Sequence, residues 1–162
     1  MFKHLITQRF NFISYLFTIL YYGIFCAFDV RFYMRNSQIR GDFMEFISNS
    51  VEETFNLGKK LGSLANRGDI ICLTGDLAAG KTHFTKGIAK GLDIDEHITS
   101  PTFNIVNEYN GRLKLYHFDV YRVNDPDEIY AIGFDEYIFS DAVSVIEWSN
   151  YIESIIPTEH IS

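Results

Sequence analysis

Short apolar runs alternate with stretches of helical periodicity along the last two thirds of the chain. Residues 70–73, 103–109, 113–120 and 142–147 are rich in β-branched and aromatic residues, which favours strands. Apolar side chains recur at helical spacing over residues 51–64, where Ser50 and Glu53 form a capping box, and a second helix is predicted over residues 82–92. A helix start is also expected at residues 124–128, with Pro126 in the first helical position. The alternation predicts an α/β fold with a mostly parallel sheet flanked by helices.

Residues 1–43 depart from this pattern. Residues 10–28 form a 19-residue stretch without a charge, which is just long enough to span a bilayer. Basic residues flank it on both sides, so no orientation follows. Met44 begins a stretch that is complete in itself, and either Met1 or Met44 can be the true start. We favour a hydrophobic leader of doubtful function at 1–43, over a membrane anchor or a packed helix, followed by the functional domain at 44–162.

The net charge of −7 is unevenly distributed. Residues 1–43 carry +3 and residues 44–162 carry −10. An acidic domain repels a phosphate backbone, so contact with RNA would need a local basic patch or a partner protein. The two cysteines, Cys26 and Cys72, lack a metal-ligand spacing, which favours reduced, buried thiols and a cytoplasmic protein.

One segment has the composition of a phosphate-binding loop. Residues 75–82 match the pattern G-x-x-x-x-G-K-[ST] between a predicted strand and a predicted helix. The loop consists of Gly75, Asp76, Leu77, Ala78, Ala79, Gly80, Lys81 and Thr82. Its backbone amides and the helix dipole would cradle the phosphates of ATP, with Lys81 reaching the β- and γ-phosphates and Thr82 coordinating Mg²⁺. The predicted fold is therefore that of a P-loop NTPase.

A P-loop also needs a carboxylate on a neighbouring strand to hold the metal or position water. Asp119 and Glu147 each end a predicted strand, and the carboxyl ends of parallel strands share one edge. His117 is a candidate base, although a single histidine beside an aromatic strand is more often structural. Arg122 can stabilise phosphate charge or pair with an acid. Trp148 can be a core aromatic, a lid or a nucleotide contact.

Four segments together resemble the TsaE (YjeE) family, the small bacterial ATPases of tRNA threonylcarbamoyladenosine biosynthesis. They read GDLAAGKT, SPTFNIVNEY, YHFDVYRV and IEW, in the family's order and spacing, between about residues 44 and 157. The resemblance implies an enzyme that binds ATP and Mg²⁺, hydrolyses ATP, and acts with the TsaB and TsaD proteins on the modification at tRNA position 37. It implies contact with tRNA only through that complex, and no membrane partner.

The resemblance also implies roles for individual residues. Lys81 would bind phosphate, Thr82 and Glu147 would hold Mg²⁺, and Asp119 would be the acid essential for hydrolysis. Ser100, Pro101 and Thr102 correspond to a switch-like loop that senses the γ-phosphate, with the Thr102 hydroxyl near the metal. Ser50 and Thr54 would lie near the adenine, and Trp148 is included among the nucleotide contacts.

The sequence departs from the family pattern at three places. Ala78 replaces a usual glycine, which costs about 1 kcal/mol if that position needs a positive φ. The chain stops soon after Pro157, where the family continues with further strands, so a truncated C-terminus and an exposed sheet edge are possible. The leader is foreign to the family. Two alternatives therefore stay open: a non-catalytic or degenerate nucleotide-binding remnant, and a P-loop kinase for a small molecule.

Overall fold

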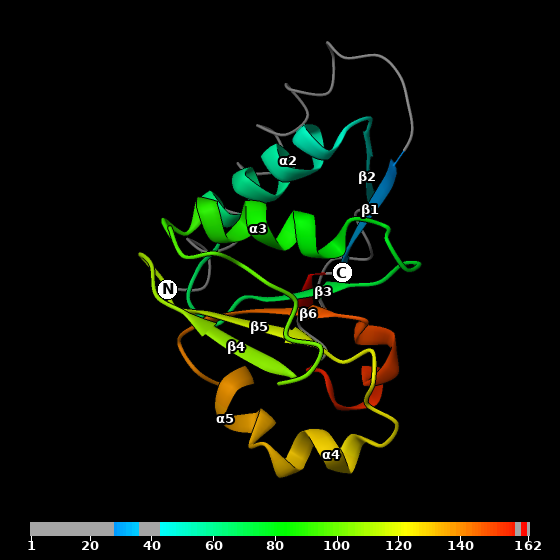
Figure 1. The fold of residues 1–162 in the computed structure, drawn as a ribbon, viewed down its shortest axis with the longest axis vertical. Coiled ribbons are helices and arrows are strands. Elements are labelled where there is room, and N and C mark those ends of the chain that lie inside the picture. Colours follow the sequence, from blue (N-terminus) through cyan, green and yellow to red (C-terminus); the bar gives the residue numbers. More distant parts are fainter. Residues whose placement is uncertain (1–27, 36–42, 158–159, 162) are drawn as a thin grey trace.

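A mixed β-sheet with helices on both faces makes up the part of the chain that the computed structural model describes, which is residues 28–35, 43–157 and 160–161 (Figure 1). The strands are β1 (Phe28–Arg35), β2 (Phe43–Ser48), β3 (Ile70–Leu73), β4 (Val106–Tyr109), β5 (Leu115–Asp119), β6 (Val143–Glu147) and β7 (His160–Ile161). The helices are α2 (Val51–Leu64), α3 (Lys81–Gly91), α4 (Pro126–Ala131) and α5 (Phe134–Ile138), followed by the short 3₁₀ turns η1 (Ser149–Tyr151) and η2 (Glu153–Ile155). This architecture confirms the predicted α/β fold class.

The strand order of the described sheet is β2-β1-β7-β3-β6-β5-β4. The four central strands β7, β3, β6 and β5 run parallel to one another. On one side β4 pairs antiparallel with β5. On the other side β1 pairs antiparallel with β7 and β2 pairs antiparallel with β1, so β2 runs in the direction of the central strands. Parallel pairing aligns the carboxyl ends of β3, β6 and β5. In register there, Glu147 faces Leu73 on one side and Asp119 on the other. The edge at which ligands collect in open α/β sheets therefore carries both predicted acids.

Two apolar clusters cover the two faces of the sheet. Helices α2 and α3 lie on one face, and α4 and α5 lie on the other (Figure 1). On the first face Phe84 and Ile88 of α3 belong to the same buried cluster as Val143 and Val145 of β6. On the second face Phe118 and Ile146 of the sheet pack with residues of α4 and α5, namely Ile129, Phe134 and Ile138. Burial on both faces explains why β6 is mostly apolar, with Ser144 and Glu147 as its two polar residues.

Helices α2 and α3 approach each other closely because glycines line their contact. A Cβ atom at Gly62 would lie 2.1 Å from the carbonyl oxygen of Ile88, and one at Gly87 would lie 2.2 Å from that of Phe55. Neither distance is compatible with a side chain at the present helix separation. The start of α2 is thereby fixed beside the start of α3, where the glycine loop ends.

Arg112, in the turn between β4 and β5, joins the ends of both helices. Its Nη2 atom donates hydrogen bonds to the carbonyl oxygens of Gly62 (2.5 Å) and Ala65 (3.1 Å), and its Nε atom donates to that of Gly91 (3.4 Å). The last carbonyls of a helix lack partners within the helix, and a cation there also complements the helix dipole. One guanidinium therefore satisfies carbonyls at the C-terminal ends of α2 and α3 together.

Most predicted elements are observed within one or two residues of their expected bounds, but the strand expected at residues 103–109 was wrong over its first half. The amides of Asn104 and Ile105 donate to the carbonyl oxygen of Pro101 at 2.8 and 2.7 Å, and Ile105 has a φ of 66°. This turn delays the strand until Val106. Proline and the local turn hydrogen bonds override the β propensity of the aromatic and branched residues.

The two ends of the described chain meet in the sheet. Strand β1 pairs with β2 and also with β7, which in turn pairs with β3. Strand β1 falls within the residues assigned to the leader, and the boundary at residue 43 stays a prediction. Apart from Phe28, the hydrophobic stretch 10–28 lies outside the described residues. Among the residues that are described, no helix has the length and apolar character needed to cross a membrane.

Candidate functional site

The glycine loop connects the end of β3 to the start of α3, as the sequence predicts. Three of its residues have a positive φ, namely Gly75 at 134°, Ala78 at 64° and Gly80 at 90°. The condition set for Ala78 is therefore met, and its Cβ is held in the left-handed region at a cost of about 1–2 kcal/mol. Helix α3 begins directly after Gly80, so its unpaired amides and positive dipole end face the loop. This arrangement can bind a phosphate.

Lys81 folds back over its own loop. Its Nζ atom donates hydrogen bonds to the carbonyl oxygens of Gly75 and Asp76, each at 2.7 Å, and lies 3.7 Å from the centre of the Trp148 ring. Partial burial lowers the pKa of Lys81, while the nearby carboxylates of Glu147 and Asp119 oppose that shift. The ammonium group thus lies at the loop, held by dipoles and a ring face rather than by a direct ion pair among the described residues.

Glu147 connects the sheet to the first turn of α3. Its side chain is buried, with one oxygen, Oε2, accepting a hydrogen bond from Thr82 Oγ1 at 2.9 Å. The other oxygen, Oε1, accepts from Thr85 Oγ1 at 3.3 Å and lies 2.8 Å from His117 Nε2. The two predicted metal ligands, Thr82 and Glu147, are therefore in direct contact.

Asp119 lies on the neighbouring strand and gathers the hydroxyls of the expected switch loop. Its Oδ2 atom accepts hydrogen bonds from Ser100 and from Thr102, the latter at 2.8 Å, and its Oδ1 atom accepts from the amide of Tyr121 at 3.1 Å. The hydroxyls of Ser100 and Thr102 are 2.6 Å apart. The structure thus brings the Ser-Pro-Thr segment, Asp119 and Glu147 to one end of the sheet, beside the glycine loop.

The two residues expected near an adenine have different surroundings. Ser50 is exposed and caps α2, accepting a hydrogen bond from the amide of Glu53 at 3.1 Å, as the capping box predicts. Thr54 is buried, bonds to Ser48 Oγ at 2.7 Å, and its Cγ2 atom would lie 3.9 Å from a Cβ placed on Gly80. Thr54 therefore borders the glycine loop, whereas the side chain of Ser50 is engaged in capping.

Trp148 follows Glu147 in a left-handed conformation with a φ of 63°. Its amide donates to the carbonyl oxygen of Leu73 at 2.8 Å, and its ring lies 4.7 Å from that of Tyr121 and 5.9 Å from that of Tyr151. A positive φ in a bulky residue is uncommon and frequently marks a functional site. Here it turns the indole ring onto Lys81.

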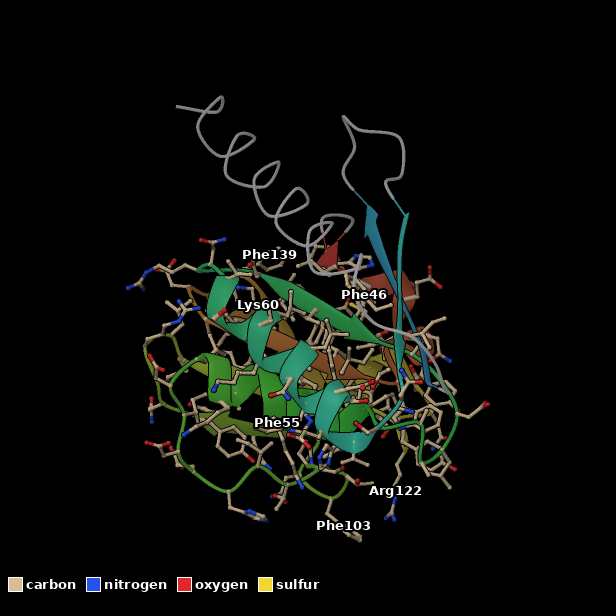
Figure 2. The ribbon with its side chains drawn as sticks, turned by 90° about the horizontal axis from the view of Figure 1, so that it is seen from above. Phe46, Phe55, Lys60, Phe103, Arg122 and Phe139 are labelled. Carbon is tan, nitrogen blue, oxygen red and sulfur yellow. The ribbon has the colours of Figure 1, made fainter. Side chains whose placement is uncertain are left out.

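Exposed apolar side chains border the same end of the molecule. Leu77 of the loop is 76% exposed and Phe103 is 85% exposed. The guanidinium of Arg122 lies 4.4 Å from the centre of the Phe103 ring, and both residues project from one end of the molecule in Figure 2. Arg122 therefore stacks on an aromatic ring, which the sequence analysis did not foresee for either residue.

Two further residues complete this picture. Thr85 was missed as a partner of Glu147, although its position one turn after Lys81 on α3 would have placed it on the face toward the loop. Burial raises the pKa of Cys72 to about 12, so its thiol stays protonated, in keeping with the buried, reduced cysteine that was expected. Cys26 lies outside the described residues.

Comparison with known proteins covers the segment that carries this site. Residues 48–162 match the model of a family described as threonylcarbamoyl adenosine biosynthesis protein TsaE. The tRNA threonylcarbamoyladenosine biosynthesis protein TsaE of Treponema pallidum (strain Nichols) is 45% identical over 114 residues, which is 70% of this chain and 84% of that protein. The protein of the same description from Bacillus subtilis (strain 168) is 48% identical over 111 residues, 68% of this chain and 69% of that one. The crystal structure of Bacillus subtilis YdiB is similar with a TM-score of 0.59 and 42% identity, covering 68% of this chain and 67% of that chain.

Proposed function

The chain belongs to the TsaE family of tRNA threonylcarbamoyladenosine biosynthesis proteins, and from this premise we propose that it is a Mg²⁺-dependent ATPase that acts with TsaB and TsaD. The observation that carries the proposal is the contact between Thr82 of the glycine loop and the buried Glu147, with Asp119 in register beside it. This combination supports phosphoryl chemistry, which needs a phosphate cradle, a metal site and a group that positions the nucleophile.

The glycine loop and Lys81 would bind the phosphates. The amides of residues 75–82 and the start of α3 supply donors in a fixed arrangement. The present partners of Lys81 are neutral carbonyl oxygens, which attract an ammonium group less strongly than phosphate oxygens do. Lys81 is therefore expected to exchange these carbonyls for a β- or γ-phosphate, while Thr54 and Trp148 border the rest of the nucleotide.

The residues present fit a magnesium ion. Mg²⁺ prefers oxygen ligands and is usually held by one or two carboxylates together with substrate phosphates. The described residues contain no cluster of three or more His, Cys, Asp and Glu side chains suited to a metal, but they do contain the buried Glu147 carboxylate 2.9 Å from the Thr82 hydroxyl. These two groups would hold the ion. When bound, Mg²⁺ neutralises charge on the phosphate oxygens.

Asp119 is proposed to orient the attacking water and to accept its proton. The side chain is buried, ends β5, and already accepts hydrogen bonds from two hydroxyls of the Ser-Pro-Thr segment. We expect Thr102 to leave Asp119 when a γ-phosphate is present, which would couple the loop to the nucleotide state. This exchange would free one acceptor position on Asp119 Oδ2 for water, while Ser100 keeps its hydrogen bond to the same oxygen.

The acidic character of residues 44–162 supports a role within an assembly. With a net charge of −10, this segment is poorly suited to bind a polyanion unaided. We therefore propose that TsaB and TsaD provide the contacts with tRNA and that this chain acts in the cytoplasm as their ATP-hydrolysing component. Exposed Leu77 and Phe103, at the rim of the site, are available for such a partner.

The test is ATP hydrolysis by the full chain, alone and with TsaB and TsaD, in the presence and absence of Mg²⁺. Asp119→Ala should lower the turnover rate at least about 100-fold, as expected for loss of a general base, while MgADP affinity changes little. Asp141→Ala is the matched control. This exposed carboxylate lies just before the N-terminal end of β6, at the opposite end of the strand from Glu147, and pairs with Arg67. Full turnover in the Asp119 variant would refute the assigned role, and binding of MgATP by the wild type without turnover would indicate a non-catalytic protein.

A further inference from the structure

His117 is a buried residue beside Glu147 to which the proposed function gives no part. It occupies the middle of β5, two residues before Asp119, so both side chains project from the same face of the sheet. The imidazole is fully buried, and its Nε2 atom lies 2.8 Å from Glu147 Oε1. The contact joins adjacent parallel strands, since His117 pairs with Val145 and Asp119 pairs with Glu147.

The direction of this hydrogen bond follows from the chemistry of its partners. An ionised carboxylate has no proton to give, so the imidazole donates through Nε2–H. The other ring nitrogen, Nδ1, is buried and has no hydrogen-bond partner among the described residues. A leucine would fill the same space without burying an unpartnered nitrogen, so packing alone does not account for an imidazole here. The bond to Glu147 does.

The donors around Glu147 divide its two oxygens. Oε1 is held by His117 and by Thr85, whereas Oε2 meets only Thr82 among the hydrogen bonds of the described residues. Resting on the function proposed above, we propose that His117 is a positioning residue of the metal site. Its Nε2–H fixes the rotation of the Glu147 carboxylate, so that Oε2 is presented together with the Thr82 hydroxyl. Partners that orient a ligating carboxylate typically contribute a 10–100-fold effect on metal affinity.

The experiment measures binding rather than turnover. ADP affinity is determined by calorimetry with the full chain, once in EDTA and once over a titration of MgCl₂. The variants are His117→Leu, which removes both nitrogens, and His117→Gln, whose amide nitrogen replaces the Nε2 donor. Ser144→Ala is the matched control: it alters a buried side chain of the adjoining strand whose Oγ atom has no hydrogen-bond partner among the described residues.

We expect His117→Leu to need about 10–100-fold more Mg²⁺ for half-saturation, with ADP affinity in EDTA within about twofold of the wild type. His117→Gln should recover most of the loss, and Ser144→Ala should behave as the wild type. Should the leucine variant fail to fold, His117→Asn takes its place, because its shorter amide cannot reach Glu147.

Three results separate this inference from the function on which it rests. A wild-type chain that binds ADP without any Mg²⁺ effect would contradict the proposed metal site itself, and this inference with it. A normal Mg²⁺ effect in the wild type together with an unchanged Mg²⁺ requirement in His117→Leu would overturn the role of His117 alone. Equal losses of affinity with and without Mg²⁺ would also overturn it, because they would reveal a structural role only.

Discussion

At the scale of single residues, the glycine loop contains one non-glycine residue, Ala78, with a strained backbone conformation. Ala78 holds a φ of 64°, a conformation in which a Cβ collides with the following carbonyl oxygen, and Gly75 and Gly80 carry the other positive φ angles of the loop. Strain of this kind persists only where the surroundings hold the backbone in place. The hydrogen bonds that Lys81 makes to Gly75 and Asp76 are such a constraint.

Replacing Ala78 by glycine should therefore raise the free energy of unfolding by up to about 1 kcal/mol, since the relief of about 1–2 kcal/mol is partly offset by the greater freedom of glycine in the unfolded chain. Ala79→Gly is the matched control, because Ala79 is not among the residues with a positive φ, and it should lower the free energy by about 0.5–1 kcal/mol. Urea unfolding of both variants measures the difference. If both substitutions destabilise equally, the loop is not strained at Ala78.

The site residues differ in how far sequence could place them. The positions of Lys81, Thr82, Asp119 and Glu147 in the fold could be predicted, because a loop motif places the first two and the ends of parallel strands place the others, whereas their roles stay predictions. The link between His117 and Glu147 could not, since it depends on which strands are neighbours and on their register. The stacking of Arg122 on Phe103 depends likewise on tertiary structure, because the turn at Pro101 replaces the first half of the strand that was expected there.

At the scale of elements, the contact between α2 and α3 determines how the loop is supported. The two backbones approach so closely that no Cβ atom would fit between them at four glycines, which are Gly58 and Gly62 of α2 and Gly87 and Gly91 of α3. The helices themselves were predictable from spacing and capping, but their separation was not. Glycine inside a helix is locally unfavourable, and its role in close packing depends on which helices are neighbours. Tertiary packing here makes use of residues that are locally unfavourable.

Gly62→Ala tests this directly. In an isolated helix the change would stabilise by about 1 kcal/mol, yet here the new methyl group would lie 2.1 Å from the Ile88 carbonyl oxygen. Overpacking of this kind typically costs about 1–3 kcal/mol, so a lower free energy of unfolding is expected. Ser63→Ala, on the exposed side of α2, should change it by no more than about 0.5 kcal/mol. A stabilised Gly62 variant would show that the helices can separate freely.

At the scale of the whole molecule, the candidate site combines residues from several separate elements. The glycine loop, α3, β5 and β6 each contribute, and Trp148 leads into the turns that follow β6. The parallel core and the helical layers were predictable because buried strands and amphipathic helices leave clear patterns. The pairing of β1 with β2 and β7 was not predicted, because residues 28–35 were assigned to the leader, although their sequence FDVRFYMR begins with the alternation of apolar and charged residues that is typical of a strand.

A ligand that joins so many elements should stabilise the entire fold. With free MgADP at 100 times its dissociation constant, the free energy of unfolding should rise by about 2.7 kcal/mol, provided that the unfolded chain does not bind. Thermal unfolding with and without MgADP measures the shift, and Lys81→Ala should remove most of it. An unchanged unfolding temperature at saturating MgADP would contradict a nucleotide site in this protein.

The turn that carries Arg112 has a practical implication for anyone altering this protein. Hairpin tips are ordinarily the first choice for grafting a fluorescent label, an affinity tag or a split point. This one is a poor choice, because a Cβ on Gly111 would lie 2.2 Å from the carbonyl oxygen of Leu92. The guanidinium of the next residue, Arg112, also binds the C-terminal ends of α2 and α3. An insertion there would loosen the support of the glycine loop from the far end of α3, at a distance from any residue that a nucleotide would touch.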